Sequence, residues 1–235
     1  MKFYGLKKVT LIDYPGKIAC TLFTHGCNFR CPFCHNPELV IQKPDNKNSI
    51  SSNRVLNFLS KRKGKLDGVV LTGGEPLLGF ADMIPFIREV KKLGFFVKID
   101  TNGTSPSAVE QLIKKKLVDF FAVDYKCTPQ NYEIMHASSN DFDSFMKTLS
   151  IIVDSGITHE IRTTVVRGLH DENEIKEMMP LIRGVEKYVI QNFVPSKTID
   201  PDYANLKGFT HNELEVLLKI AKRTVKNTEI RNDFE

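Results

Sequence analysis

Residues 18–36, IACTLFTHGCNFRCPFCHN, join a nearly continuous apolar stretch, Ile18–Thr24, to three closely spaced cysteines. An apolar run of this length predicts a strand whose two faces are both covered. Cys27, Cys31 and Cys34 follow the run directly, so we expect them in a loop at the carboxyl end of that strand. This one stretch therefore predicts both the sheet type and the place of its chemistry.

Strands of the same apolar kind recur along the chain and alternate with amphipathic helices. The helical pattern is clear in residues 142–153, where apolar side chains recur with helical spacing. The further strands are predicted at Gly68–Thr72, Phe95–Asp100, Asp119–Asp124, Glu160–Val166 and Lys187–Phe193. Strands that alternate with helices predict a parallel α/β sheet with right-handed crossovers.

The length of 235 residues limits how many such units can form. A complete eight-unit barrel takes about 250 residues, so six units predict an open (β/α)6 partial TIM-type barrel. We expect one domain over residues 1–235, with an N-terminal extension at 1–17, the core at 18–209 and a C-terminal helix at 210–235. Functional side chains should lie at the carboxyl ends of the strands.

Composition excludes several function classes. The chain has 33 Lys and Arg against 28 Asp and Glu, a net charge of +5, which is mild for a nucleic-acid binder. It has no apolar run of about eighteen residues, the length that a membrane helix needs. The charged start MKFYGLKKVT lacks a signal-peptide core. We therefore expect a cytoplasmic protein without nucleic-acid or membrane partners.

The five cysteines indicate metal or redox chemistry, because three of them crowd into one loop. Cubic iron–sulfur clusters usually take four thiolates, so three local ones leave an open position, as a catalytic metal requires. Cys20 lies in the predicted strand and should be buried and inert, and Cys127 is a weaker ligand candidate. The alternative is a structural zinc site that adds His35 to the three cysteines.

Polar residues follow the other predicted strands. Gly73 and Gly74 at a strand end form an ordinary turn or let the backbone approach a ligand closely. Asp124 and Lys126 share one face of their strand, where they form a solvated ion pair or bind a zwitterion. Arg162 lies inside an apolar strand and needs a partner, at an edge or in the site.

The spacing Cys-x3-Cys-x2-Cys, with Phe33 before the last cysteine, resembles the signature of the radical S-adenosylmethionine (SAM) superfamily. The resemblance implies one [4Fe–4S] cluster on Cys27, Cys31 and Cys34, with SAM chelating the open iron through its amino and carboxylate groups. It also implies that Phe33 lies near the adenine and that His35 belongs to the SAM site.

The same resemblance implies further SAM contacts at the other strand ends. Gly-Gly-Glu-Pro would meet the methionine amino group, and Asp-x-Lys resembles a SAM-binding pair of glycyl-radical activating enzymes. Pyruvate formate-lyase activating enzymes carry a histidine where Val194 aligns here, so Gln191 is the substitute contact. Whether Asp100 and Asp124 bind a monovalent cation stays open. The implied contacts are Gly73, Gly74, Glu75, Thr101, Asn102, Asp124, Lys126, Arg162 and Gln191.

Two further stretches, Val9–Lys17 and Cys34–Leu39, resemble the activating proteins of anaerobic ribonucleoside-triphosphate reductase. This implies an enzyme that cleaves SAM reductively and installs a glycyl radical on that reductase, with a flavodoxin- or ferredoxin-type electron donor. Residues 35–72 contain no cysteine, so no added cluster domain is expected there. The alternatives are activation of pyruvate formate-lyase, a small-molecule enzyme of the deazaguanine synthase type, and a zinc-stabilised binding module.

Overall fold

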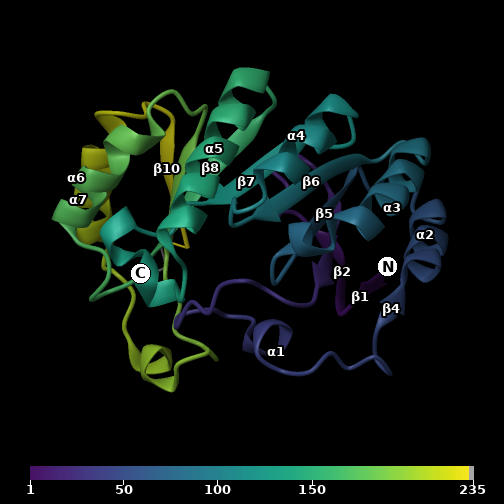
Figure 1. The fold of residues 1–235 in the computed structure, drawn as a ribbon, viewed down its shortest axis with the longest axis horizontal. Coiled ribbons are helices and arrows are strands. Elements are labelled where there is room, and N and C mark those ends of the chain that lie inside the picture. Colours follow the sequence, from purple (N-terminus) through teal and green to yellow (C-terminus); the bar gives the residue numbers. More distant parts are fainter. Residues whose placement is uncertain (233–235) are drawn as a thin grey trace.

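One sheet forms the centre of the computed structural model, which describes residues 1–232. Its strand order is β10-β9-β8-β7-β6-β5-β3-β2, and the sheet curves through the molecule (Figure 1). A small separate pair joins β1 (Lys2–Phe3) to β4 (Ile50–Ser51). The strands of the large sheet are β2 (Gly5–Thr10), β3 (Ala19–Thr24), β5 (Gly68–Gly73), β6 (Phe96–Thr101), β7 (Phe120–Asp124), β8 (His159–Val165), β9 (Tyr188–Asn192) and β10 (Thr228–Arg231).

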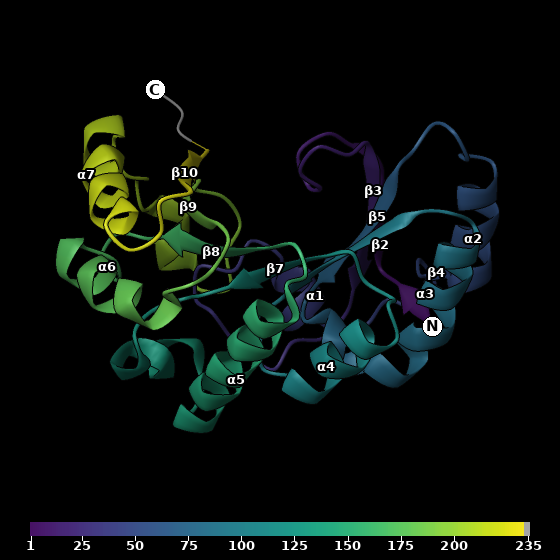
Figure 2. The same cartoon turned by 90° about the horizontal axis from the view of Figure 1, so that it is seen from above.

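Helices cover the outer face of this curved sheet (Figure 2). They are α2 (Ser52–Ser60), α3 (Phe80–Lys92), α4 (Pro106–Lys114), α5 (Ser139–Ser155), α6 (Glu172–Met178) and α7 (His211–Lys222). The short helix α1 (Pro37–Val40) lies instead in the connection that follows the cysteines. Short 3-10 turns are η1 (Pro76–Gly79), η2 (Pro129–Met135), η3 (Met179–Ile182) and η4 (Pro201–Asn205). No helix in the described residues is long and apolar enough to cross a membrane.

The predicted open α/β barrel is confirmed. The six strands expected from apolar runs all form, and they pair in chain order, each parallel to the next. Strands β2 and β10 lie at opposite edges of the sheet order, so within residues 1–232 the barrel does not close. The parallel sheet places the carboxyl ends of the six strands along one rim.

Both ends of the chain differ from expectation. The N-terminal extension contains β2, which pairs antiparallel with β3 and widens the sheet. The predicted C-terminal helix over 210–235 is wrong in its extent, because α7 ends at Lys222 and β10 follows, parallel to β9. The last part of that prediction, 233–235, lies outside the described residues. The sequence did not predict β10, because Thr228–Arg231 includes two charged residues and has no apolar run. Arg231 satisfies the fully buried Glu160 of β8 through two hydrogen bonds, of 3.0 and 2.7 Å.

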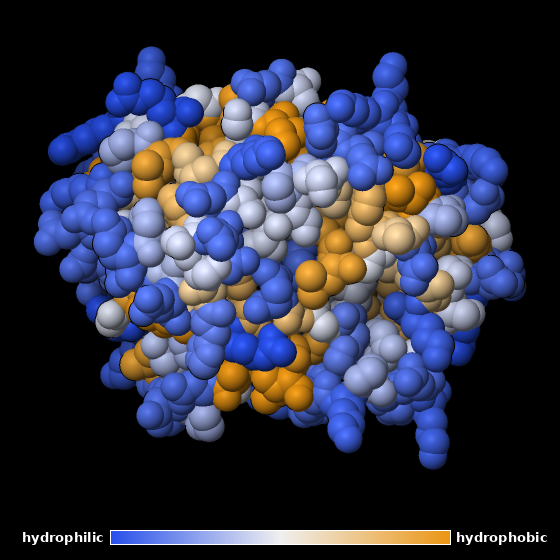
Figure 3. Space-filling view, in the orientation of Figure 1, coloured by the Kyte–Doolittle hydropathy of each residue, from blue (hydrophilic) through white to orange (hydrophobic). Residues whose placement is uncertain are grey.

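The interior of the barrel contains an apolar cluster, here called the floor, and a separate group of charged side chains. The floor is a cluster of Tyr14, Ala19, Val70, Phe120 and Ala122, in which the Tyr14 and Phe120 rings meet edge to face at 5.7 Å. The larger apolar core includes side chains of the helices and of the strands. Figure 3 shows hydrophilic side chains over most of one face, with apolar side chains gathered in smaller patches.

Candidate active site

A cavity of about 290 Å³ lies where the parallel strands end. Every site residue predicted from the sequence lines it: Cys27, Cys31, Phe33, Cys34, His35, Gly73, Gly74, Glu75, Thr101, Asn102, Asp124, Lys126, Arg162 and Gln191. Sequence reasoning missed Asn36, Val40, Thr72 and Thr164 and placed Asp100 only nearby. Thr164 lies two residues after Arg162 on the same strand, so the alternation of strand faces could have found it.

The cysteine loop after β3 is held in shape by its own polar groups. The Arg30 guanidinium donates hydrogen bonds to the carbonyl oxygens of Cys27, at 2.6 Å, and Phe29, at 2.8 Å. The Phe29 amide donates to Cys27 Sγ at 3.4 Å, and the Cys34 amide donates to the Cys31 carbonyl at 3.0 Å. These bonds fold the loop so that all three thiols line the same cavity.

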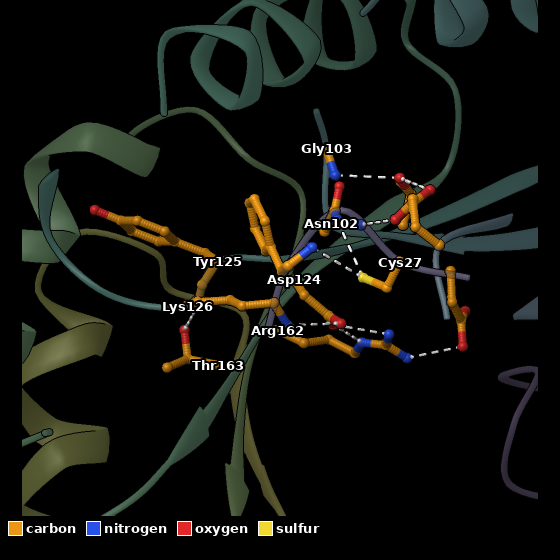
Figure 4. A network of polar contacts seen from close by, with 12 residues as sticks. Cys27, Asn102, Gly103, Asp124, Tyr125, Lys126, Arg162 and Thr163 are labelled. Carbon is orange, nitrogen blue, oxygen red and sulfur yellow. Dashed lines mark hydrogen bonds and ion pairs between the residues drawn. The ribbon is translucent and has the colours of Figure 1, made fainter. Parts of the chain in front are cut away.

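The end of β6 ties the loop to the sheet. The Asn102 side chain donates to Asn28 Oδ1 at 2.8 Å, and Asn28 donates in turn to Thr104 Oγ1 at 3.0 Å. Figure 4 shows Asn102 beside Cys27, whose sulfur lies 4.0 Å from the Asn102 amide nitrogen. The turn predicted at Asn102 therefore also positions the first cysteine.

Gly73 and Gly74 allow the end of β5 to touch the backbone of the cysteine loop. A Cβ on Gly73 would lie 2.3 Å from the Thr24 backbone, and one on Gly74 would lie 2.0 Å from the Gly26 carbonyl oxygen. In this contact the Gly74 amide donates to the Thr24 carbonyl at 3.1 Å, and the Glu75 amide donates to that of Gly26 at 2.7 Å. The glycines are therefore required by contact between two loops of the site.

Glu75 joins the ends of β5 and β6 through its buried carboxylate. Oε1 accepts hydrogen bonds from the Leu77 amide at 3.0 Å and the Thr101 hydroxyl at 2.8 Å. Oε2 accepts one from the Asn102 amide at 2.7 Å. Burial raises the pKa of Glu75 to about 7, although these three donors act in the opposite direction. The three bonds fix the carboxylate at the wall of the cavity.

Charged side chains of alternating sign cross the barrel interior on β6, β7 and β8. Lys98 Nζ lies 2.5 Å from Asp100, and Arg162 contacts Asp100 at 3.3 Å and Asp124 at 2.8 Å. Lys126 Nζ contacts the other oxygen of Asp124 at 3.4 Å. Figure 4 shows Asp124 and Arg162 next to each other. Arg162 therefore bridges two carboxylates at the wall of the cavity, and its contact with SAM stays a prediction.

Asp124 and Lys126 of this row stay charged although they are partly buried. Burial lowers the pKa of Lys126, but Asp124 and the nearby cysteines more than offset that effect, so its pKa is raised. Burial likewise raises the pKa of Asp124, and Arg162 and Lys126 more than offset it, so its pKa is lowered. Asp100 and Asp124 thus both have cationic partners from the protein itself.

The three thiols fit a multi-iron cluster better than a single ion. Burial raises the pKa of Cys31 to about 12 and also raises the pKa values of Cys27 and Cys34, so binding of a metal must displace their protons. In residues 1–232 no group of three His, Cys, Asp or Glu side chains is placed to hold one ion. The thiols nevertheless share one cavity, as ligands to different irons of a cluster would.

Aromatic rings form the wall beyond the cysteines. Phe33 packs against Tyr203 of η4 with ring centroids 6.3 Å apart, and His35 stacks on Phe193 at 5.1 Å. Burial lowers the pKa of His35, so its ring is neutral at pH 7. This wall provides flat apolar surfaces of the kind that a nucleobase can pack against.

The two remaining cysteines lie elsewhere. Cys20 is fully buried in β3, as expected for an inert thiol, and burial raises its pKa to about 12. Cys127 is also fully buried, and it is not among the described residues that line the cavity. The cavity therefore gives Cys127 no ligand role.

Comparison with known proteins identifies the family. The sequence model of the radical SAM superfamily matches residues 21–181, which is more than half of the chain. The chain belongs to the radical SAM superfamily. This radical SAM enzyme accordingly uses a [4Fe–4S] cluster and SAM as cofactors.

Two relatives place this radical SAM enzyme among the glycyl-radical enzyme activating enzymes. It is 34% identical over 231 residues to a Methanocaldococcus jannaschii protein provisionally named as such an enzyme, covering 97% of this chain and 94% of the relative. It is 28% identical over 209 residues to the pyruvate formate-lyase-activating enzyme of Clostridium pasteurianum, covering 84% and 83%.

Solved structures share the fold of this radical SAM enzyme. Streptococcus suis SuiB bound to its precursor peptide SuiA matches with a TM-score of 0.70 at 18% identity, covering 90% of this chain and 48% of SuiB. Native anSMEcpe with bound AdoMet matches with a TM-score of 0.58 at 14% identity, covering 85% and 58%. The chain thus spans about half the length of these structures, and at such identities the likeness concerns the fold alone.

Proposed function

We propose that Cys27, Cys31 and Cys34 hold the [4Fe–4S] cluster and leave its fourth iron for SAM. The observation that carries this proposal is that three thiols from one loop share a cavity with every predicted SAM contact. When bound, the reduced cluster supplies the electron that splits SAM into methionine and a 5′-deoxyadenosyl radical. The residues of the chain bind and orient these groups.

The polar groups of the cavity match the parts of SAM. A carboxylate has about four acceptor sites, and Glu75 uses three of them on Leu77, Thr101 and Asn102, which leaves one for the methionine amino group. We assign the adenine to the wall that contains Phe33 and His35. Gly73 and Gly74 belong with Glu75 to the contact with the amino group, and Thr101 and Asn102 line the site beside it. The contacts to the carboxylate and the ribose of SAM go to Asp124, Lys126, Arg162 and Gln191.

Buried charges prepare this site before SAM arrives. Lys126 stays protonated because the Asp124 carboxylate faces it, and Arg162 is fixed between two carboxylates. Charges fixed in a site of low dielectric need no reorganisation when a zwitterion binds. Phe33 and Val40 add apolar side chains to the cavity wall, which limits the access of water to the reacting groups.

We propose that the enzyme installs a glycyl radical on a large protein partner. Relatives that align over most of the chain carry the name of such activating enzymes, which supports this assignment. The residues at 9–17 and 34–39 favour anaerobic ribonucleoside-triphosphate reductase as the partner. The Clostridium pasteurianum relative makes pyruvate formate-lyase the second candidate. A flavodoxin- or ferredoxin-type protein would supply the electron.

The open side of the barrel offers a surface for such a partner. Val9, Leu11, Ile12 and Ile18, here called the open rim, expose apolar side chains, with Leu11 71% and Ile12 76% exposed. The rim adjoins a cavity of about 620 Å³ that extends to β10 and shares Asp100, Arg162 and Gln191 with the active site. Clustered exposed apolar residues mark protein interaction sites, so a polypeptide segment could enter here.

We also propose a cytoplasmic location. The five cysteines are free thiols in the described structure, which suits a reducing compartment.

The proposal is tested under anoxia with iron-loaded, reduced protein and SAM. We expect release of 5′-deoxyadenosine, and with the reductase present a glycyl-radical signal in electron paramagnetic resonance. Cys31→Ala should lose iron and SAM cleavage, whereas Cys20→Ala, which changes a buried thiol outside the cavity, should keep both. Reduced, iron-loaded wild-type protein that releases no 5′-deoxyadenosine would show the proposal to be wrong.

The choice of partner is tested by exchange. Pyruvate formate-lyase replaces the reductase in the same assay, and the partner that gives the larger glycyl-radical signal is the one supported. Turnover of a free pterin-like compound, with no radical on either protein, would instead indicate a small-molecule enzyme.

A further inference from the structure

The connection that follows β7, residues 126–135, links two parts of the active site. It begins at Lys126, whose ammonium faces Asp124. It ends at Met135, whose carbonyl accepts a hydrogen bond of 2.8 Å from the Arg30 amide in the cysteine loop. Between them, the Tyr132 ring meets Phe29 edge to face at 6.0 Å. A shift of this connection would therefore move both Lys126 and the loop that carries the thiols.

His170, between β8 and α6, holds the start of this connection from outside the cavity. Its Nε2 lies 2.7 Å from the Lys126 carbonyl oxygen, and its Nδ1 accepts the Val166 amide at 3.0 Å. A neutral ring with its proton on Nε2 satisfies both contacts. The side chain is buried, and burial lowers its pKa to about 4, which keeps it in that neutral form.

Glu174 of α6 holds the middle of the same connection. Its carboxylate accepts hydrogen bonds from the Thr128 amide at 2.7 Å, the Thr128 hydroxyl at 3.2 Å and the Asn131 side chain at 2.8 Å. Asp171 caps the start of α6 by accepting the Glu174 amide at 2.8 Å. His170 and Glu174 thus fix residues 126–131 from one rigid segment, and neither lines the cavity.

We propose that His170 and Glu174 are positioning residues that fix Lys126 and the cysteine loop relative to each other. The inference rests on the proposed role of Lys126 in binding SAM. Loss of the His170 bond frees the Lys126 carbonyl, so the ammonium is no longer held opposite the thiols. SAM affinity then falls although no residue that touches the cavity has changed.

The test compares two buried histidines of the anoxic, iron-loaded holoenzyme. His159 is the matched control, because its ring also bridges two backbone groups, the Ile157 carbonyl at 2.8 Å and the Glu186 amide at 3.1 Å. It lies at the start of β8, away from the strand ends that form the cavity. The measurements are iron content, melting temperature, the SAM dissociation constant by equilibrium dialysis, and KM and kcat for 5′-deoxyadenosine release.

His170→Phe should weaken SAM binding about tenfold at unchanged iron content, as removal of outer hydrogen-bond partners does. His159→Phe should lower the melting temperature comparably and leave SAM binding within about twofold of wild type, since distant sites act independently. His170→Gln should restore SAM binding, because its amide can donate to Lys126 and accept from Val166. Equal SAM affinity in His170→Phe and His159→Phe would overturn the proposal.

Two further variants complete the test. In a Lys126→Ala background, His170→Phe should add no more than about a twofold loss of SAM affinity, because coupled residues are not additive. A full additional loss would contradict the action of His170 through Lys126. Should His170→Phe not fold, Glu174→Gln carries the test, since its amide nitrogen faces the donors of Thr128 or Asn131. Unchanged SAM affinity in Glu174→Gln would overturn the proposal.

This outcome can be separated from failure of the proposed function. If wild-type holoenzyme binds SAM without cleaving it, the proposed activity fails, while the dialysis measurements still test the positioning role.

Discussion

At the scale of single residues, Gly74 is where the two loops of the active site meet most closely. An added Cβ would lie 2.0 Å from the Gly26 carbonyl oxygen, a distance that neither loop can keep. Both loops are tied to strand ends and cannot separate freely, because the Gly74 and Glu75 amides bond to Thr24 and Gly26. The site therefore depends on the absence of a side chain as much as on the thiols.

We predict that Gly74→Ala lowers the free energy of unfolding by about 1–3 kcal/mol, the usual cost of overpacking, and reduces iron loading. Gly79→Ala is the control, because an added Cβ there has nothing within 4 Å and its φ is −95°. Its cost should stay below about 1 kcal/mol, since only a helix cap changes. Urea unfolding and iron analysis measure both variants. Equal stability and iron content in the two variants would contradict the steric argument.

His170 also makes stability depend on pH. Its pKa is about 4 in the folded chain against 6.5 for a free side chain, so the unfolded state takes up a proton first as pH falls. The free energy of unfolding should therefore decrease between pH 6.5 and 4, by at most about 3 kcal/mol at 1.36 kcal/mol per pH unit. Urea unfolding of the iron-free chain over this range measures the slope.

His170→Gln is the control for this pH dependence. Glu75, with a pKa raised to about 7, acts in the opposite sense, because the folded chain loses stability as pH rises from 4.5 to 7. Both proteins contain Glu75, so the difference between them isolates His170. Identical slopes in the two proteins would mean that His170 does not titrate as described.

At the scale of elements, β10 is held to the sheet by a buried ion pair. Arg231 donates two hydrogen bonds to Glu160 of β8, which has no exposed surface, and it also contacts Glu229 at 2.7 Å. Removal of one partner leaves the Glu160 carboxylate buried and without its cation. Such a loss costs much more than the loss of an exposed pair.

We predict that Arg231→Met lowers the free energy of unfolding by about 3 kcal/mol, near the lower end for buried pairs because Arg231 is partly exposed. Adding Glu160→Gln should recover part of this loss by removing the buried charge. Lys176→Met removes an exposed pair with Glu172 and should cost less than about 0.5 kcal/mol. Chemical unfolding measures the free energy of unfolding of each variant. Equal decreases in the Arg231 and Lys176 variants would contradict the prediction.

The sequence predicted those strands and helices whose buried faces consist of apolar residues in a regular pattern. Strands such as β5 and β7 are covered on both faces, so Gly68–Thr72 and Asp119–Asp124 showed them directly. Strands β2 and β10 lie at the edges, and β10 consists of Thr, Glu, Ile and Arg. Such edge strands form through pairing with a neighbour and through ion pairs, which no local pattern reveals.

The predicted site residues share one cavity because the carboxyl ends of parallel strands converge. Cys27, Glu75 and Asp124 come from separate motifs, and strand order alone brings them together. The sequence could not show that Gly74 touches the cysteine loop or that Lys98 and Arg162 share Asp100. These contacts depend on the distances between neighbouring strands, and the spacing of residues along the sequence does not predict such distances.

At the scale of the whole molecule, the open barrel separates the proposed SAM site from the proposed docking surface for a partner. The thiols lie at the strand ends, whereas the open rim lies between β2 and β3, beside the larger cavity that reaches β10. The two cavities share Asp100, Arg162 and Gln191, so the charged interior is their common wall. A protein partner can therefore be recognised by one surface and modified at another.

We predict that Leu11→Ser combined with Ile12→Ser raises KM for the protein partner about tenfold or more, because an apolar docking surface is lost. The rate of SAM cleavage without the partner depends on the cavity at the strand ends, so it should change little in this variant. Val216→Ser on α7 is the control, since Val216 is also exposed but lies on a different surface. The measurement is the glycyl-radical signal in electron paramagnetic resonance as a function of partner concentration, which gives the partner KM of each variant. An equal partner KM in rim and control variants would mean that the rim does not dock the partner.

The anchors of the cysteine loop have a consequence for biosynthesis. The loop is made early, yet it is fastened by Glu75, Asn102, Met135 and finally Asp200, whose amide donates to the Pro32 carbonyl at 3.0 Å. Because a nascent chain emerges from its N-terminus, the three thiols leave the ribosome long before these anchors exist. Iron that binds at that stage would meet a cysteine loop that has not yet folded. Cluster assembly should therefore follow synthesis of the chain at least as far as Asp200.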